Sequence, residues 1–189
     1  MKTQTWAAAA VGLFLVLALV GFLALRGGAD RDDAAEVSSA IADGAIVRDD
    51  SYVLGEEGSS GVQLVEFLDF ECEACGAAYP IVEDLREKYA GEVTFVMRYF
   101  PLPGHFNAER AARAVESAAR QGELEAMYDK MYETQSTWGE AQEPHDDLFR
   151  SFAEEIGLDM DQYDEDYASQ EVKERISRDV ADEIGRAHV

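Results

Sequence analysis

The chain has 189 residues, and its 39 acidic against 16 basic residues give a formal net charge of −23. DNA or RNA would be repelled by that charge, so the composition argues against nucleic-acid binding. Apolar residues make up 47% of the chain, which is enough for one hydrophobic core and an appendage. We therefore expect a single domain with an acidic, well-solvated surface.

The first predicted element is a membrane anchor. After a short N-terminal segment, residues 1–5, an uncharged apolar stretch covers residues 6–25. At about 1.5 Å per residue, a helix of this length matches the roughly 30 Å hydrocarbon core of a bilayer. We expect an uncleaved single-pass anchor in the cell membrane, which usually leaves the following domain extracytoplasmic. A cleaved signal peptide is the alternative, although the sequence after Leu25 does not resemble its cleavage site.

The next segment, residues 26–50, is rich in Ala, Gly, Asp and Ser. That composition is typical of a flexible acidic linker. The folded domain is expected to occupy residues 51–189.

Two strands and a helix are predicted at the start of this domain. Residues 62–70, VQLVEFLDF, are apolar on both faces of an extended segment, which is typical of a strand buried inside a sheet. Residues 74–90 predict a helix, and residues 93–100 predict a second strand. Such a unit makes its two strands parallel, with a right-handed connection. The expected inner face of the helix carries Ala78, Ile81, Val82, Leu85 and Tyr89.

The remainder, from about residue 107 onward, has a helical pattern. The segment AERAARAVESAARQG predicts an alanine-rich helix that ends at Gly122. Three apolar stripes predict three further helices: Met127, Tyr128, Met131 and Tyr132; Leu148, Phe149, Phe152 and Ile156; and Val172, Ile176, Val180 and Ile184. The whole is an α/β arrangement with inserted helices.

The only two cysteines, Cys72 and Cys75, follow the first predicted strand directly and lie at the start of the predicted helix. This spacing brings the side chains close enough for a disulfide after slight adjustment. So short a loop gains little stability from cross-linking, which favours a reactive pair. Unpaired N–H groups and the helix dipole favour a thiolate on Cys72. Cys75 is expected to be more buried and to act as the resolving thiol.

Two other uses of the cysteines are an inert disulfide and a structural zinc site. Zinc needs four ligands and the pair supplies two, while His105, His145 and His188 show no ligand spacing. A CxxC motif at a strand-to-helix junction favours redox chemistry, with no cofactor and no metal ion.

The segments around the cysteines resemble a known family. VEFLDFECEACGAAYP is similar to the active-site segment of thioredoxin-fold proteins, and RYFPLPGHFNAERAARAVESA is similar to the DsbA-like branch. The resemblance covers about residues 51–189 and implies a thioredoxin-like fold with a helical insertion. It also implies thiol–disulfide exchange with cysteine-containing extracytoplasmic proteins, and a membrane partner that reoxidises the pair.

The resemblance assigns roles to three further residues. Glu66, six positions before Cys72, takes the place of a buried carboxylate that relays protons to the second cysteine, Cys75. A solvated strand carboxylate is the alternative for Glu66. Pro80 matches a helix-kinking proline, or is an ordinary first-turn proline. His105, in the loop after the second strand, is interpreted as structural.

One departure from the family lies between the cysteines. Strong oxidants of the family carry a histidine there, whereas this chain has Glu73 and Ala74, and Glu71 precedes Cys72. Negative neighbours oppose thiolate formation. We predict that the pKa of Cys72 lies toward the upper end of a family range of roughly 3.5 to 7. The reduction potential should be nearer about −200 mV than about −120 mV.

A second departure concerns the C-terminus. In the family, the last helix leads into a Thr-Pro loop whose cis-proline faces the cysteines, and two hairpin strands follow. The four prolines of this chain are elsewhere: Pro80, Pro101, Pro103 and Pro144. The resemblance thus implies an incomplete domain that lacks this loop and these strands, with an exposed edge on strand 62–70. A truncated non-catalytic remnant, or a metallochaperone-type module that binds a soft cation through both thiolates, are the alternatives to an active enzyme.

Overall fold

The structure is a computed structural model that describes residues 46–184. The predicted anchor, residues 6–25, and residues 26–45 of the predicted linker lie outside the described residues. Within 46–184, no helix combines the length and the apolar character needed to cross a membrane.

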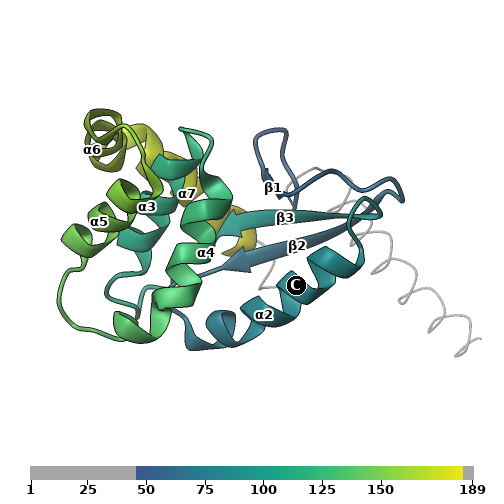
Figure 1. The fold of residues 1–189 in the computed structure, drawn as a ribbon, viewed down its shortest axis with the longest axis horizontal. Helices are drawn as coiled ribbons and strands as arrows, with labels where there is room; N and C mark the ends of the chain where they lie inside the picture. The colour runs from purple at the N-terminus through teal and green to yellow at the C-terminus, as the bar shows by residue number, and fades with distance from the viewer. Residues whose placement is uncertain (1–45, 185–189) are drawn as a thin grey trace, which may run out of the picture. The chain divides into compact units, whose positions relative to one another are not determined.

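The sheet has three strands among the described residues: β1 (Tyr52–Leu54), β2 (Val62–Leu68) and β3 (Val93–Tyr99). The central strand β3 pairs antiparallel with β1 and parallel with β2, in the order β1-β3-β2 (Figure 1). The predicted parallel pair is therefore confirmed. The sequence does not predict β1, because three residues are too few to show a strand period.

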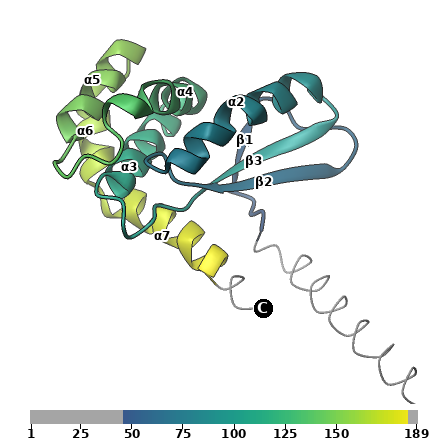
Figure 2. The same cartoon turned by 90° about the horizontal axis from the view of Figure 1, so that it is seen from below.

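The connection between the parallel strands is helix α2 (Glu73–Lys88), which lies along one face of the sheet (Figure 2). Val82 is buried against the core, as predicted, but Ile81 is 62% exposed. The expectation that Ile81 faces the core is wrong. Successive residues of a helix are rotated by about 100°, so when Val82 faces the core its neighbour Ile81 points toward solvent. Gly91 follows the helix with φ 73°, a left-handed conformation that favours glycine.

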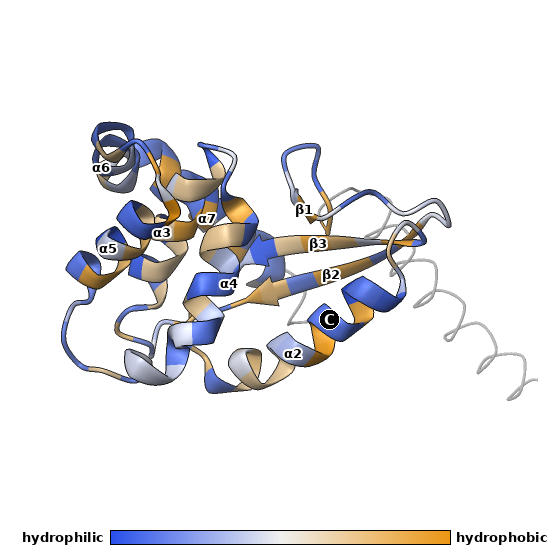
Figure 3. Ribbon diagram, in the orientation of Figure 1, coloured by the Kyte–Doolittle hydropathy of each residue, from blue (hydrophilic) through white to orange (hydrophobic). Residues whose placement is uncertain are grey.

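The prediction that strand 62–70 is buried on both faces is also wrong. Val62 is 55% exposed and the middle of β2 is only partly buried, so full burial is reached at its end, where Leu68 is 4% exposed. The reason is position: β2 is an edge strand that pairs only with β3 in the described part of the chain. By contrast β3, with a neighbour on each side, is apolar along most of its length (Figure 3).

The helices after the sheet pack around α3 (Ala108–Ala119), which contacts each of the other four. Those four are α4 (Leu124–Thr134), α5 (Asp146–Ile156), α6 (Met160–Ala168) and α7 (Gln170–Ile184). Fully buried alanines on α3 allow this close approach. The four helices predicted here are confirmed. Helix α6 and the 3-10 turn Gln135–Thr137 (η1) are not predicted, because their apolar positions are too few to form a stripe.

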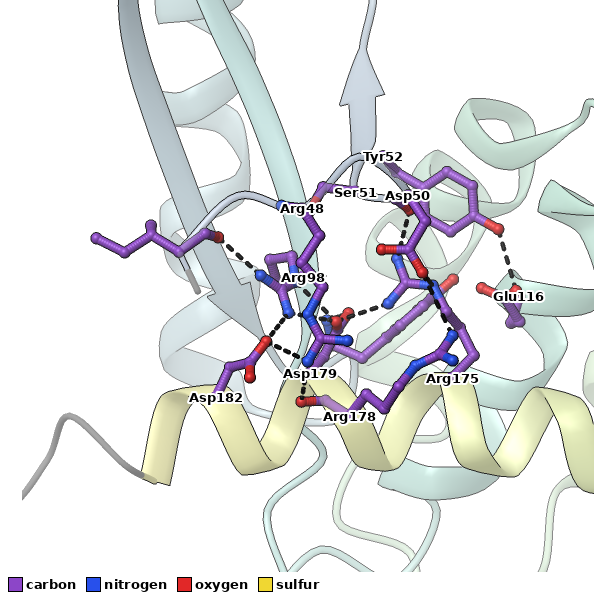
Figure 4. A network of polar contacts seen from close by, with 12 residues as sticks. Arg48, Asp50, Ser51, Tyr52, Arg98, Glu116, Arg175, Arg178, Asp179 and Asp182 are labelled. Atoms are coloured by element: carbon purple, nitrogen blue, oxygen red, sulfur yellow. Dashed lines mark hydrogen bonds and ion pairs between the residues drawn. The ribbon is translucent and has the colours of Figure 1, made fainter. Parts of the chain in front are cut away.

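Helix α7 is tied to the sheet through buried ion pairs (Figure 4). The Arg98 side chain on β3 and the Asp179 side chain on α7 are both 0% exposed. Arg98 Nε donates to Asp179 Oδ1 at 2.7 Å, and Tyr99 N donates to the other oxygen, Oδ2, at 3.0 Å. Arg175, one turn earlier on α7, also donates to Asp179 Oδ1, at 2.6 Å. The pairing satisfies charges that would be costly to bury alone.

The segment that precedes β1 joins the same network (Figure 4). Arg48 forms an ion pair with Asp182 at 2.6 Å, and Arg178 forms one with Asp50 at 3.3 Å. Residues 46–50, which the sequence analysis places in the linker, are thus held against α7.

Candidate active site

The two cysteines lie where the sequence predicts them, at the N-terminus of α2. Cys72 is the N-cap residue, in an extended conformation, and its carbonyl oxygen accepts from Gly76 N at 3.0 Å. Its backbone N–H donates to the carbonyl oxygen of Asp69 at 3.2 Å. Both thiols are free and half-buried, and Cys75 packs against the hydrophobic core.

The surroundings of Cys75 perturb the pKa of its thiol. Burial raises the pKa of Cys75 to about 11, and interaction with Cys72 acts in the same direction, while a hydrogen bond from the backbone N–H of Asp69 lowers it. A high pKa keeps Cys75 protonated at neutral pH. This state suits a residue that receives a proton when a disulfide opens.

Glu66 shares a cavity with Cys75. The cavity has a volume of about 210 Å³, and the two residues line it together with Tyr79, Tyr128 and Tyr132. Burial raises the pKa of Glu66, Glu83 raises it further, and Arg86 acts in the opposite direction. A raised pKa and a shared cavity are the properties needed for proton exchange with the thiol.

Pro80 lies inside α2 rather than in its first turn, and it is exposed. The first-turn alternative is therefore wrong. A proline at an interior position removes one backbone hydrogen bond of the helix, as the kinking role requires.

Asp69, which the sequence analysis does not single out, joins the end of β2 to the loop after β3. Its carboxylate is 2% exposed. Oδ1 accepts from Glu71 N at 2.8 Å, and Oδ2 accepts from Leu102 N at 3.0 Å. Oδ2 also lies 2.6 Å from His105 Nδ1. The buried Asp69 therefore contacts both the His105 ring, through its carboxylate, and the backbone N–H of Cys72, through its carbonyl oxygen.

Glu71, the residue directly before Cys72, is a second buried carboxylate. It is 1% exposed, and its Oε2 accepts from Asn107 N at 2.5 Å. Within the described residues its other oxygen, Oε1, has no hydrogen-bond partner. A negative charge is thus held next to the first cysteine by the start of α3.

Gln135, in turn η1, is a further residue that the sequence does not reveal. Its side-chain nitrogen donates to the carbonyl oxygens of Phe70 and Cys72 at 2.8 and 2.9 Å. A Cβ on Gly76 would lie 2.0 Å from the Gln135 side-chain oxygen, so glycine leaves room for this contact. Gln135 and Cys72 are far apart in the chain, and no local pattern reports such a contact.

The described part of the chain has no cluster of side chains suited to binding a metal ion. Among residues 46–184, no three or more His, Cys, Asp or Glu side chains come together in a group that could hold an ion.

A parallel strand–helix–strand unit with a CxxC pair at the helix N-terminus, followed by packed helices, is the arrangement of thioredoxin-like proteins. Residues 48–189 match the thioredoxin family. The chain belongs to this family.

Solved structures support this assignment. A thioredoxin-like oxidoreductase from Silicibacter pomeroyi is 30% identical with a TM-score of 0.60, over 74% of this chain and 75% of that one. The thiol-disulfide exchange protein α-DsbA2 from Wolbachia pipientis has a TM-score of 0.63 at 21% identity, over 80% and 78% of the two chains. The catalytic domain of Proteus mirabilis ScsC has a TM-score of 0.60 at 16% identity, over 77% and 78%. The last two show the fold alone.

The curated relatives that the chain matches are much longer proteins. A Na(+)/H(+) antiporter NhaA 3 from Salinispora tropica is 39% identical over 120 residues, which is 63% of this chain and 17% of the relative. A Na(+)/H(+) antiporter NhaA from Herminiimonas arsenicoxydans is 33% identical over 133 residues, which is 70% of this chain and 20% of the relative. The chain thus spans a fifth or less of these relatives' length.

Proposed function

We propose that this protein carries out thiol–disulfide exchange on extracytoplasmic protein substrates through Cys72 and Cys75. The observation that carries the proposal is the placement of the two thiols on the first turn of α2, with Cys75 and Glu66 lining one cavity. Nearby helix N–H groups and the dipole favour negative charge on Cys72.

In the first step, a substrate thiolate attacks the Cys72 sulfur of the oxidised pair. A substrate–Cys72 disulfide forms, the Cys72–Cys75 bond breaks, and Cys75 leaves with the electron pair. The leaving thiolate takes up a proton, because the pKa of Cys75 is raised to about 11. Glu66, with its raised pKa, supplies that proton across the shared cavity.

In the second step, another substrate thiolate attacks the substrate sulfur of the mixed disulfide. Cys72 leaves as a thiolate, and the substrate disulfide is complete. The substrate has lost two electrons and the cysteine pair has gained them. The same residues serve the reverse direction, reduction or isomerisation.

The proposed location is the cell membrane, with the catalytic domain on the extracytoplasmic side. The apolar stretch 6–25 supports an anchor, and disulfide formation on proteins belongs to oxidising compartments. A membrane redox partner would reoxidise Cys72 and Cys75 after each turnover.

The test is oxidation of a reduced two-cysteine peptide by the pre-oxidised full-length protein, with Cys72→Ser and Cys75→Ser as matched variants. We expect stoichiometric peptide oxidation by the natural chain and none by Cys72→Ser. In the reductive direction, Cys75→Ser should accumulate a mixed disulfide at Cys72. Full activity of Cys72→Ser would remove the proposal, and stoichiometric Cu(I) binding without thiol exchange would favour a metallochaperone instead.

A further inference from the structure

Carboxylates surround the first turn of α2. Glu71 and Glu73 flank Cys72 in the sequence, and Asp69 is buried below them. Glu140 approaches from the segment before α5, and a hydrogen bond with Glu73, together with the Glu73 charge, raises the pKa of Glu140. Negative charge at this position opposes ionisation of a neighbouring thiol. A positive charge near this turn would offset the effect of these carboxylates.

His105 is placed to supply that charge. Its Nδ1 lies 2.6 Å from Asp69 Oδ2, and the same Asp69 accepts the Cys72 backbone N–H through its carbonyl oxygen at 3.2 Å. Asp69 Oδ1 also accepts from Glu71 N at 2.8 Å. The buried Asp69 thus connects the imidazole ring of His105 to the backbone N–H groups of Glu71 and Cys72.

The electrostatic surroundings of His105 point the same way. Burial alone would lower the pKa of His105, but the hydrogen bond to Asp69 and its charge, followed by the charges of Glu71 and Glu73, outweigh burial and raise it. The imidazolium of His105 therefore persists to a higher pH than that of an ordinary histidine. His105 also lines a groove beside α7, together with three charged residues, Glu109, Arg110 and Lys173.

We propose that His105, held by Asp69, is a positioning residue for the exchange reaction: its imidazolium offsets the carboxylates around the CxxC motif and so favours the thiolate of Cys72. This inference rests on the proposed function, in which Cys72 is the attacked and attacking sulfur. The positive charge then comes from His105, in the loop after β3. The two residues between the cysteines, Glu73 and Ala74, carry no positive charge.

The test compares His105→Gln and His105→Lys in the full-length reduced protein. Glutamine keeps a hydrogen-bond donor for Asp69 but removes the charge, whereas lysine keeps the charge. Arg110→Gln is the matched control, because Arg110 pairs with Asp146 at 3.0 Å and not with Asp69. The pH dependence of alkylation at Cys72, resolved from Cys75 by mass spectrometry, reports the thiol pKa without any turnover.

We expect His105→Gln to raise the pKa of Cys72 by about one unit. The alkylation and exchange rates near neutral pH should fall together, by up to about tenfold, since the thiolate reacts. Lysine should restore most of the rate, and Arg110→Gln should change neither quantity. An unchanged Cys72 pKa in folded His105→Gln overturns the inference while leaving peptide oxidation, and so the proposed function, intact.

A second measurement needs no variant and covers the case in which His105→Gln does not fold. The pKa of His105, followed by NMR, should be lower in the disulfide form than in the reduced form, because oxidation removes the thiolate and coupling between two groups is reciprocal. Equal His105 pKa values in the two forms would overturn the inference.

Discussion

Two regions of this domain bury charge in opposite ways. Around Arg98 and Asp179, charges of both signs meet in a network that satisfies them, and both side chains are 0% exposed (Figure 4). Around the CxxC motif, the buried charges are carboxylates of one sign, and Glu71 keeps an oxygen with no hydrogen-bond partner in the described structure. We infer that the first region serves stability, whereas the second leaves a buried carboxylate oxygen without a partner and relies on the part-exposed His105 to offset its carboxylates, where ionisation of a thiol can be tuned.

The largest expected effect falls on the reactive region. Cys72→Ser should abolish exchange, a loss of at least about a thousandfold, because the attacked sulfur is gone. The free energy of unfolding should change by only about 0.5 kcal/mol, since the side chain is half-buried at a helix end. Stopped-flow peptide oxidation and urea unfolding measure the two quantities. A large loss of stability would blur the contrast between the regions.

The opposite pattern is expected for the network. Arg98→Met leaves Asp179 buried without its main partner, which should cost about 3–5 kcal/mol of stability. Urea unfolding measures this, and the alkylation rate of Cys72 in the folded variant should stay unchanged. Arg178→Gln is the control, because that side chain is 52% exposed and its pair should contribute only about 0–1 kcal/mol. Equal losses in both variants would contradict the distinction between buried and exposed pairs.

Glu66→Gln should separate activity from stability within the active site. Loss of the proton donor should slow exchange by about a hundredfold, at the low end for general acid–base catalysis. By contrast, the free energy of unfolding at neutral pH should rise in this variant. The pKa of Glu66 is raised in the folded state, chiefly by burial, so its contribution is present at low pH and is lost as pH rises through that pKa.

The glutamine variant should therefore have a higher urea midpoint than the natural chain at neutral pH, and the advantage should vanish in acid. The pH dependence of the midpoint is the measurement. An exchange rate equal to that of the natural chain would show that Glu66 is only a strand carboxylate.

The smallest expected effect is at the rim of the network. Burial would raise the pKa of Asp182, but hydrogen bonds from Arg98 and Arg48 lower it. The stability from Asp182 is therefore present above the ordinary carboxyl pKa and is lost as pH falls through the lowered value. Asp182→Asn should cost about 1 to 2 kcal/mol at neutral pH, the scale of hydrogen bonds to charged groups. Unfolding curves from neutral to acid pH should converge for the two proteins.

Much of the fold could be predicted from local patterns. The placement of Cys72 and Cys75 follows from a strand end, a helix start and a spacing of three, all of which lie within a few residues. Helices α3, α4, α5 and α7 each carry a clear apolar stripe. Burial was less predictable, as Val62 and Ile81 show, because it depends on which neighbours a strand or helix face receives.

The supporting residues of the site could not be predicted, because their partners are distant in the chain. Asp69 meets His105, and Gln135 reaches the backbone of Cys72. Likewise nothing in the sequence singles out Arg98 and Asp179. Only the packing of α7 on β3 brings their side chains together. Contacts between residues that are distant in the chain leave no repeating pattern in the sequence.

The most direct test of the central claim is the redox equilibrium of Cys72 and Cys75 in glutathione buffers of graded composition. The account predicts one reversible two-electron transition that involves both thiols, with a midpoint near about −200 mV. A protein whose two thiols form no disulfide with each other at any glutathione ratio would contradict it.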